Sequence, residues 1–296
     1  GSTPIANEHG TAPGIFMRVE RADAGACLIF ALPGVPTEMR PMWEQSVAPA
    51  ILAARGEARV IHHRRIKCFG VGESQLEAML PDLIRRGREP SVGITVSDAT
   101  ITLRITAAGV DDAECYAAME PTIAIIRESV ATLAYGEEED ELEDVVSRLL
   151  VERGQTVAVA EWATGGLVSQ ALARTAAAST VFAGGVVLSS LTQLQSLLRV
   201  PDVLSLSANP NVSAVAMEAA IAVRNMAGAD YGIGIAAFPP EPDRPAAHVC
   251  ISITTPQRTR RLRFGSATHP AIRQARAAKQ ALNALRLILL SQLGDI

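Results

Sequence analysis

Residues 157–172 read VAVAEWATGGLVSQAL, and this stretch decides the fold of the C-terminal half of the chain. The apolar run at 157–160 predicts a short buried strand, the Gly165 and Gly166 pair predicts a turn, and the residues after it predict a helix. A strand that enters a helix through such a turn leaves unpaired backbone N–H groups at the helix N-terminus, where anions bind and nucleophiles often lie. The corner of the turn holds Trp162 and Ala163, and neither side chain can act as a nucleophile.

The composition is that of a globular protein. The chain has 296 residues, of which 48% are hydrophobic, enough for about two or three domains with real cores. No apolar run approaches the roughly 20 residues of a membrane-spanning helix, and the first residues contain no apolar signal segment. The net charge of −4 gives no reason to expect nucleic-acid binding. The four cysteines are far apart and form no CxxC pair, which favours reduced core thiols. We therefore expect a cytoplasmic protein that binds neither nucleic acid nor a membrane.

The first of three predicted segments, residues 1–57, looks incomplete. An apolar strand at 27–32 is followed by the turn PGVP at 33–36 and by a helix at 37–54, for which Thr37 is a plausible N-cap. A strand, a turn and a helix are too few to bury their own apolar faces. We expect this segment to be the end of an α/β domain whose beginning is missing, and the lack of an initial Met favours a fragment.

The second segment, residues 58–136, predicts an α+β sandwich with both helices on one face of one sheet. The predicted order is a strand at 59–69, a helix at 75–86, strands at 91–96 and 100–107, and a helix at 111–133. The basic runs at 62–65 and 258–263 are interpreted as solvated strand faces rather than RNA contacts. The acidic run EEEDELED at 137–144 is interpreted as a solvated linker that enters a helix, with a metal site as the alternative.

The third segment, residues 137–296, alternates helices with strands and predicts a three-layer α/β domain with a mixed sheet. The predicted helices are 142–153, 167–173, 191–198, 213–226 and 270–293, and the predicted strands are 156–160, 181–189, 231–237, 247–255 and 258–264. The helices at 213–226 and 272–293 are candidate faces of a homodimer and are equally consistent with ordinary core packing.

Several motifs, in this order, resemble the competence/damage-inducible CinA family. GTAPG at 10–14 and LPGVPTEM at 32–39 resemble the end of its molybdopterin-binding-like N-terminal domain. FGVGESQLE at 69–77, PSVGITVS at 90–97 and TLRITA at 102–107 resemble its KH-like middle domain, and AEWATGGLVSQAL at 160–172, FAGGVVLSS at 182–190 and GADYGI at 228–233 resemble its amidohydrolase domain. The resemblance implies an α/β fold class: a partial molybdopterin-binding-like segment, a KH-like α+β domain and a three-layer CinA domain.

The resemblance also implies two chemistries. The N-terminal domain of the family is associated with hydrolysis of ADP-ribose-like nucleotides with a divalent metal. The C-terminal domain is associated with deamidation of nicotinamide mononucleotide (NMN) by a serine nucleophile that a lysine and a tyrosine assist. A nucleotide is therefore the small-molecule ligand that the resemblance implies.

The positions that would carry the deamidation are changed in this chain. The family turn Glu-Ser-Cys-Thr-Gly-Gly here reads Glu-Trp-Ala-Thr-Gly-Gly at 161–166, so Trp162 stands in the place of the serine. Ser189 matches the tyrosine, and Leu194 falls where the lysine belongs. The chain has only two lysines, Lys67 and Lys279, and the family's glycine-rich loop reads AAFPPEPDRP at 236–245. Proline donates no backbone N–H, so this loop cannot cradle an anion as a glycine-rich loop does.

These changes predict an eroded site with no assigned catalytic residue. Trp162 either fills the vacated pocket or serves as an aromatic platform for a nucleotide base. Thr164 would be a replacement nucleophile, but no base is in view. The candidate ligand-binding residues are Glu161, Thr164, Gly165 and Gly166 at this turn and Gly34, Thr37 and Glu38 in the first segment, where a purely structural turn is the alternative.

We expect no metal site in this chain, because the phosphate motif and acidic pair of the family belong to the upstream part of the N-terminal domain. A divalent metal is expected only in a complete N-terminal domain. The preferred hypothesis is a non-catalytic C-terminal domain that serves dimerisation or nucleotide binding. The alternatives are an active NMN amidase with rearranged residues and a pure interaction module.

Overall fold

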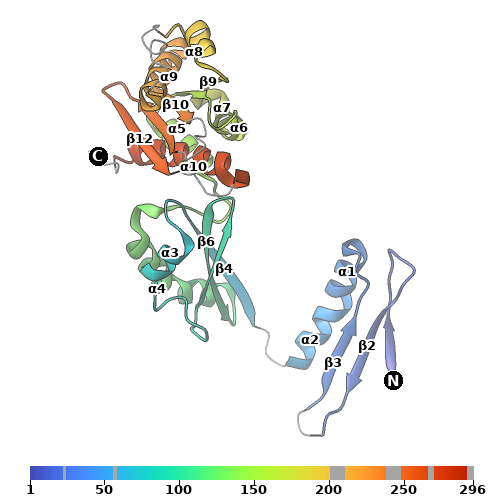
Figure 1. The fold of residues 1–296 in the computed structure, drawn as a ribbon. Coiled ribbons are helices and arrows are strands. Elements are labelled where there is room, and N and C mark those ends of the chain that lie inside the picture. Colours follow the sequence, from blue (N-terminus) through green and yellow to red (C-terminus); the bar gives the residue numbers. More distant parts are fainter. Residues whose placement is uncertain (23–24, 56–58, 201–210, 238–247, 266–269, 292–296) are drawn as a thin grey trace. The chain divides into compact units, whose positions relative to one another are not determined.

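The structure is a computed structural model that describes residues 1–22, 25–55, 59–200, 211–237, 248–265 and 270–291. It divides into two compact units, of which one comprises residues 1–61 with 108–115 and the other residues 62–107 with 116–296 (Figure 1).

The first unit contains an antiparallel sheet in the order β1-β2-β3. Its strands are β1 (Ser2–Ile5), β2 (Gly14–Val19) and β3 (Cys27–Ala31), and its helical stretch comprises α1 (Pro36–Met42), the π-helical η1 (Trp43–Val47) and α2 (Ala48–Arg55). The predicted strand and helix are confirmed, but the prediction that Thr37 caps the helix is wrong. Val35 is the N-cap, because Pro36 has no N–H and a fixed φ, which suit the first helical position.

The second unit begins with a sheet in the order β5-β6-β4-β7. Its strands are β4 (Val60–Cys68), β5 (Ser91–Ser97), β6 (Thr100–Gly109) and β7 (Ala134–Glu137), and its helices are α3 (Glu73–Met79), α4 (Asp112–Val130) and η2 (Ala131–Leu133). The predicted elements occur in the predicted order, but the sequence did not predict the last strand, β7. The helix predicted at 75–86 ends at Met79, because Pro81 disfavours helical geometry at the residue before it.

The acidic run at 137–144 is not the solvated linker that the sequence suggests. Glu137 belongs to β7, which pairs with β4 and so places the acidic run beside the basic residues of β4. The guanidinium of Arg64 donates to Glu137 over 2.7 Å, and that of Arg65 donates to Glu139 over 2.7 Å. In the basic run at 62–65, Arg64 and Arg65 are therefore paired with acidic residues, although the Arg65 side chain is still 40% exposed.

The C-terminal domain of the second unit is a mixed sheet in the order β12-β11-β10-β8-β9, in which β8, β9 and β10 are parallel and β11 and β12 antiparallel. Its strands are β8 (Val157–Glu161), β9 (Phe182–Val187), β10 (Tyr231–Ala237), β11 (His248–Thr254) and β12 (Thr259–Gly265). Its helices are α5 (Leu142–Arg153), α6 (Leu167–Arg174), α7 (Ala178–Val181), α8 (Leu191–Leu198), α9 (Val212–Ala227) and α10 (Pro270–Leu289). The predicted three-layer α/β domain is confirmed.

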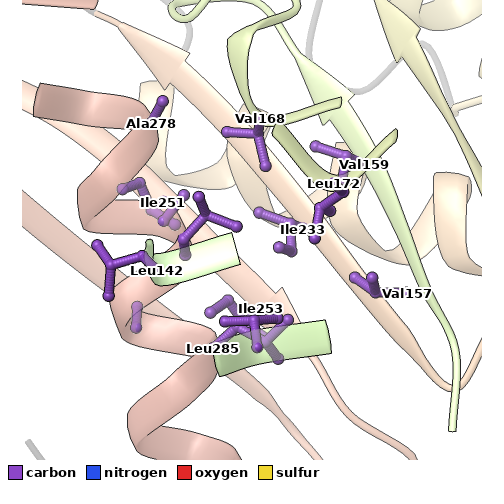
Figure 2. Packing of buried hydrophobic residues seen from close by; sticks show 14 of the residues in the cluster. Leu142, Val157, Val159, Val168, Leu172, Ile233, Ile251, Ile253, Ala278 and Leu285 are labelled. Carbon is purple, nitrogen blue, oxygen red and sulfur yellow. The ribbon is translucent and has the colours of Figure 1, made fainter. Parts of the chain in front are cut away.

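The two faces of this sheet are packed differently. Branched side chains such as Val159, Ile233 and Ile251 face a core completed by Leu142 of α5 and Leu285 of α10 (Figure 2). The opposite face carries small residues, and a Cβ added at Gly234 would lie 2.0 Å from the carbonyl oxygen of Ala216 on α9. The backbone of α9 therefore rests directly on the sheet.

The alanine-rich helices α9 and α10 both bury one face in the core of their own domain. The buried residues of α9 are Val212, Val215, Ala216, Ala219, Ala220 and Val223, and those of α10 include Ala277, Ala278, Ala281, Leu282, Ala284 and Leu285. Core packing accounts for these apolar faces, and the homodimer stays a prediction.

Candidate functional site

Glu161, the last residue of β8, is completely buried and organises the turn that follows. Its carboxylate accepts hydrogen bonds from Thr164 Oγ1 (2.6 Å), Gly166 N (3.1 Å), Val168 N (3.0 Å), Ser169 N (2.7 Å) and Ser169 Oγ (2.6 Å). Gly165 and Gly166 have φ of +63° and +99°, which lets the chain turn back so that these donors face the carboxylate. The helix N-terminus that the sequence suggests as an anion site thus already holds the anion of Glu161.

Trp162 and Leu194 meet in one apolar cluster on the α8–α9 face of the sheet. The backbone N–H of Trp162 donates to the carbonyl oxygen of Ile235 over 2.9 Å, which extends the pairing of β8 with β10. The partly exposed indole packs against a cluster that contains Leu194, which is 1% exposed. Ala163 packs against the core on the opposite face. Trp162 and Leu194 are therefore associated with the same apolar cluster, and neither side chain presents an acid or a base there.

Ser189 lies just after β9 and is exposed. Its backbone N–H and its hydroxyl both donate to Gln193 Oε1, over 2.8 and 3.0 Å. The neighbouring Ser190 caps α8 by accepting a hydrogen bond from Gln193 N. Ser189 thus belongs to the start of α8. The proline-rich stretch at 238–245 lies outside the described residues.

Thr164 is completely buried and its hydroxyl donates to Glu161, so it is held as part of the turn. The sequence identifies Glu161 and Thr164 as candidate ligand-binding residues, and the structure places both in the internal hydrogen-bond network of the turn. Gly165 is exposed at its surface.

In the first unit, Glu38 brings the two N-terminal motifs together. Its carboxylate accepts a hydrogen bond from Asn7 Nδ2 over 2.7 Å, and Asn7 Nδ2 also donates to the carbonyl oxygen of Ala12. A Cβ at Gly10 would lie 2.3 Å from Glu38 Oε2, so the Glu38 carboxylate lies directly against the GTAPG stretch. Gly34 and Thr37 are exposed. The sequence did not point to Asn7, which links the two motifs.

The two lysines of the chain converge on one carboxylate, which the sequence did not suggest. Lys67 Nζ lies 2.8 Å from Glu141 Oε1, and Lys279 Nζ lies 3.4 Å from Glu141 Oε2 and 2.6 Å from Thr100 Oγ1. Glu141 also forms a capping box with Asp144 at the start of α5. Burial raises the pKa of Glu141, but the hydrogen bond from Lys67 and the charge of Lys279 outweigh it and leave the pKa lowered. Both lysines serve the junction between the middle and C-terminal domains.

The described part of the chain has neither a metal-binding cluster nor a membrane-spanning helix. None of its residues form a group of three or more His, Cys, Asp or Glu side chains that could hold a metal ion. Within the same residues, every helix is too short or too polar to cross a membrane.

Two family models match the chain. The CinA C-terminal domain matches residues 139–289, and the damage-inducible protein CinA KH domain matches residues 63–136. The chain belongs to the CinA family. This result confirms the resemblance that the sequence motifs carry.

Relatives in the CinA family align along most of the chain. A CinA-like protein of Synechococcus is 32% identical, with 99% of this chain and 70% of that protein covered. A CinA-like protein of Frankia casuarinae is 36% identical (88% and 60% covered), and a putative competence-damage inducible protein of Bacillus subtilis is 34% identical (86% and 61%). The chain spans about 60% of the length of these last two relatives. A crystal structure of competence damage-inducible protein A from Klebsiella pneumoniae covers 51% of this chain and 97% of its own, with 28% identity and a TM-score of 0.47.

Proposed function

We propose that the C-terminal domain of this CinA-family chain has lost NMN deamidation and serves as a non-catalytic module. The observation that carries this proposal is the shared apolar cluster of Trp162 and Leu194. The family resemblance implies a serine and a lysine at these positions. A serine nucleophile needs a base within hydrogen-bond reach, whereas the indole offers only an N–H donor and leucine offers no polar atom.

The hydroxyl groups near the turn do not replace the missing pair. Thr164 and Ser169 each donate to Glu161 over 2.6 Å, a geometry in which a carboxylate could in principle take a proton. However, Glu161 accepts five hydrogen bonds and is completely buried, so its lone pairs are already used to hold the turn. This network favours a structural role for the carboxylate.

We infer that any ADP-ribose hydrolysis by a whole CinA-family protein, with its divalent metal, depends on residues other than 1–57 of this chain. Within these residues Glu38 is the acid of the family motif, and it already accepts a hydrogen bond from Asn7. The described residues also contain no cluster that fits a metal ion. The chain therefore remains a candidate component of NAD-derived nucleotide metabolism through its family, with its own C-terminal domain as a binding or scaffold module.

The deciding experiment is ammonia release from NMN by the purified chain, with recovery of added ammonium as the assay control. We expect no release above the rate without protein. Release that persists after repurification, and that T164V or S169A abolishes, would overturn the proposal and identify a rearranged nucleophile. The double variant W162S/L194K, checked for folding by circular dichroism, is assayed in the same way. It measures how much ammonia release returns when a serine and a lysine stand at these two positions.

A fluorescence titration separates the two non-catalytic functions. The chain has two tryptophans, Trp43 and Trp162, so W43F leaves Trp162 as the only indole. Saturable quenching of W43F by NMN would support a nucleotide platform. An unchanged spectrum, with no ammonia release, would support a scaffold in which the indole fills the old pocket.

A further inference from the structure

A cavity lies at the end of the C-terminal sheet's parallel strands opposite to the Glu161 turn. It has a volume of about 290 Å³, and its lining includes Arg153, Tyr231, Gln257, Arg258, Arg260 and Ser291. Tyr231 is the first residue of β10, whereas Glu161 pairs with Ile235 farther along the same strand. Because a strand rises roughly 3.3 Å per residue, the cavity and the turn are separate sites.

The lining of this cavity carries an excess of positive charge. Three of its residues are arginines, and none of its described lining residues is an Asp or a Glu. The C-terminal ends of α5 and α10 also reach it, through Arg153 and Leu289, and each helix end contributes roughly −0.5 charge. These helix ends and the carboxylate of Asp230, whose charge acts on Tyr231, reduce the positive charge of the three arginines but leave a net excess, which favours an anion. The carboxylate of Asp230, next to Tyr231 in the sequence, is engaged by the N–H and hydroxyl of Thr156.

Neutral groups hold the backbone and side chains of the cavity in place. The guanidinium of Arg153 donates to the carbonyl oxygens of Leu149 and Leu289. The hydroxyl of Thr255 accepts from Arg258 N over 3.0 Å and donates to Arg258 O over 3.0 Å, which fixes the turn between β11 and β12. Arg260 lies opposite Ile253 in the sheet register. Arg258 and Arg260 also have other interactions within the chain, so a ligand would share these groups.

We propose that this cavity binds a dianionic oxyanion, namely a phosphate group. A guanidinium presents a planar fork of N–H donors that matches two oxygens of a phosphate. Arg258 and Arg260 would supply these donors, whereas the Arg153 guanidinium already donates to two carbonyl oxygens and contributes mainly its charge. The hydroxyl of Ser291 and the amide of Gln257 line the same cavity, whereas the Tyr231 hydroxyl there already donates to Gln155 Oε1 over 2.9 Å. The volume is at the low end of ligand sites, which favours inorganic phosphate or a small phosphomonoester over a nucleic acid. This inference is independent of the proposed function.

The test is calorimetric titration of the whole chain with inorganic phosphate at constant ionic strength, set with KCl. We expect saturable binding at one site, and at least about tenfold weaker binding in R258Q/R260Q, since the loss of even one charge-assisted contact costs about a factor of ten. R261Q is the matched control, because Arg261 is exposed on the same strand and does not line the cavity. Glycerol 2-phosphate in a second titration distinguishes a phosphomonoester site from a site for the free ion.

The proposal fails if the native chain gives no saturable heat, or if R258Q/R260Q binds phosphate as well as the native chain. It also fails if R261Q loses as much affinity as the double variant, because the effect would then reflect general surface charge. Circular dichroism and the unfolding midpoint of each variant show that a loss of binding does not come from a loss of fold. The NMN assay tests the Glu161 turn, at the other end of these strands. The phosphate site and the loss of NMN deamidation can therefore each fail while the other holds.

Discussion

Ser169 binds the carboxylate of Glu161 twice, through its hydroxyl over 2.6 Å and through its backbone N–H over 2.7 Å. This pair joins the end of β8 to the first turn of α6. The buried anion therefore satisfies N–H groups of the helix that otherwise lack partners. In other proteins a turn of this kind binds an external anion, whereas here it binds the carboxylate of Glu161 from the same chain.

The first prediction concerns the replacement of that anion. In E161Q an amide NH₂ takes the place of one carboxylate oxygen and faces the N–H and O–H donors, so buried donors lose their acceptor. We expect E161Q to lower the free energy of unfolding by about 3 kcal/mol in urea titrations. S169A removes a single hydroxyl and should cost about 1 kcal/mol. A stability of E161Q equal to that of the native chain would show that the network contributes little.

The fold around this turn could be predicted from the sequence, whereas the role of Glu161 could not. The small apolar run, the glycine pair and the following amphipathic residues are local signals, and they specify strand, turn and helix. An acid beside a helix N-terminus looks the same in the sequence whether it binds a ligand or the helix itself. The difference depends on its burial and its five donors, which are properties of the folded chain.

The missed features are mostly contacts between distant residues. Glu141 is bound by Lys67 and Lys279, which lie in different domains of the sequence, and no local pattern signals this meeting. Strand β7 was missed because its four residues are too few to show alternation. Because β7 pairs with β4, the acidic run lies beside the basic residues of β4 and forms ion pairs with them.

The second prediction tests the apolar character of the Leu194 position. L194K would place an ammonium group in a cluster where the native side chain is 1% exposed. We expect a loss of about 3 kcal/mol or more in the free energy of unfolding, because burial penalises the charged form. T192K, at an exposed position of the same helix, is the matched control and should change it by less than about 0.5 kcal/mol. If L194K is as stable as T192K, the vacated pocket is open to water and the proposed filling is wrong.

The third prediction concerns the direct contact of α9 with the sheet. A methyl group at position 234 would come within 2.0 Å of a backbone oxygen of α9, so the helix must move. We expect G234A to cost about 3 kcal/mol, measured by chemical unfolding. G265A has no neighbouring atom within 4 Å of the added group and should be nearly neutral. Equal effects of the two variants would mean that α9 can shift without loss of packing.

The fourth prediction is a pH dependence at the junction that Glu141 forms. The folded pKa of Glu141 is lowered, so its contribution is present above the unfolded pKa of roughly 4.3 and is lost as the pH falls through the folded value. Because the side chain is 39% exposed, we expect the effect to stay below about 1 kcal/mol. Urea titrations at several pH values between neutral and acid should show a smaller acid loss in E141Q than in E139Q, whose native side chain is 86% exposed. Parallel curves for the two variants would exclude the ion pairs as a source of acid sensitivity.

The fifth prediction uses the four cysteines, which are all free. Cys68, Cys115 and Cys250 are buried, and burial raises the pKa of the Cys68 thiol to about 12 and raises that of Cys250. Only a thiolate attacks the disulfide of a reagent such as DTNB and releases thionitrobenzoate, so these three buried thiols should react only as the protein unfolds. Cys27 is partly exposed on β3 and should give one fast equivalent, which C27S removes. Two or more fast equivalents, or a fast phase that survives in C27S, would show that a buried thiol is reached without unfolding and that the packing around it opens readily.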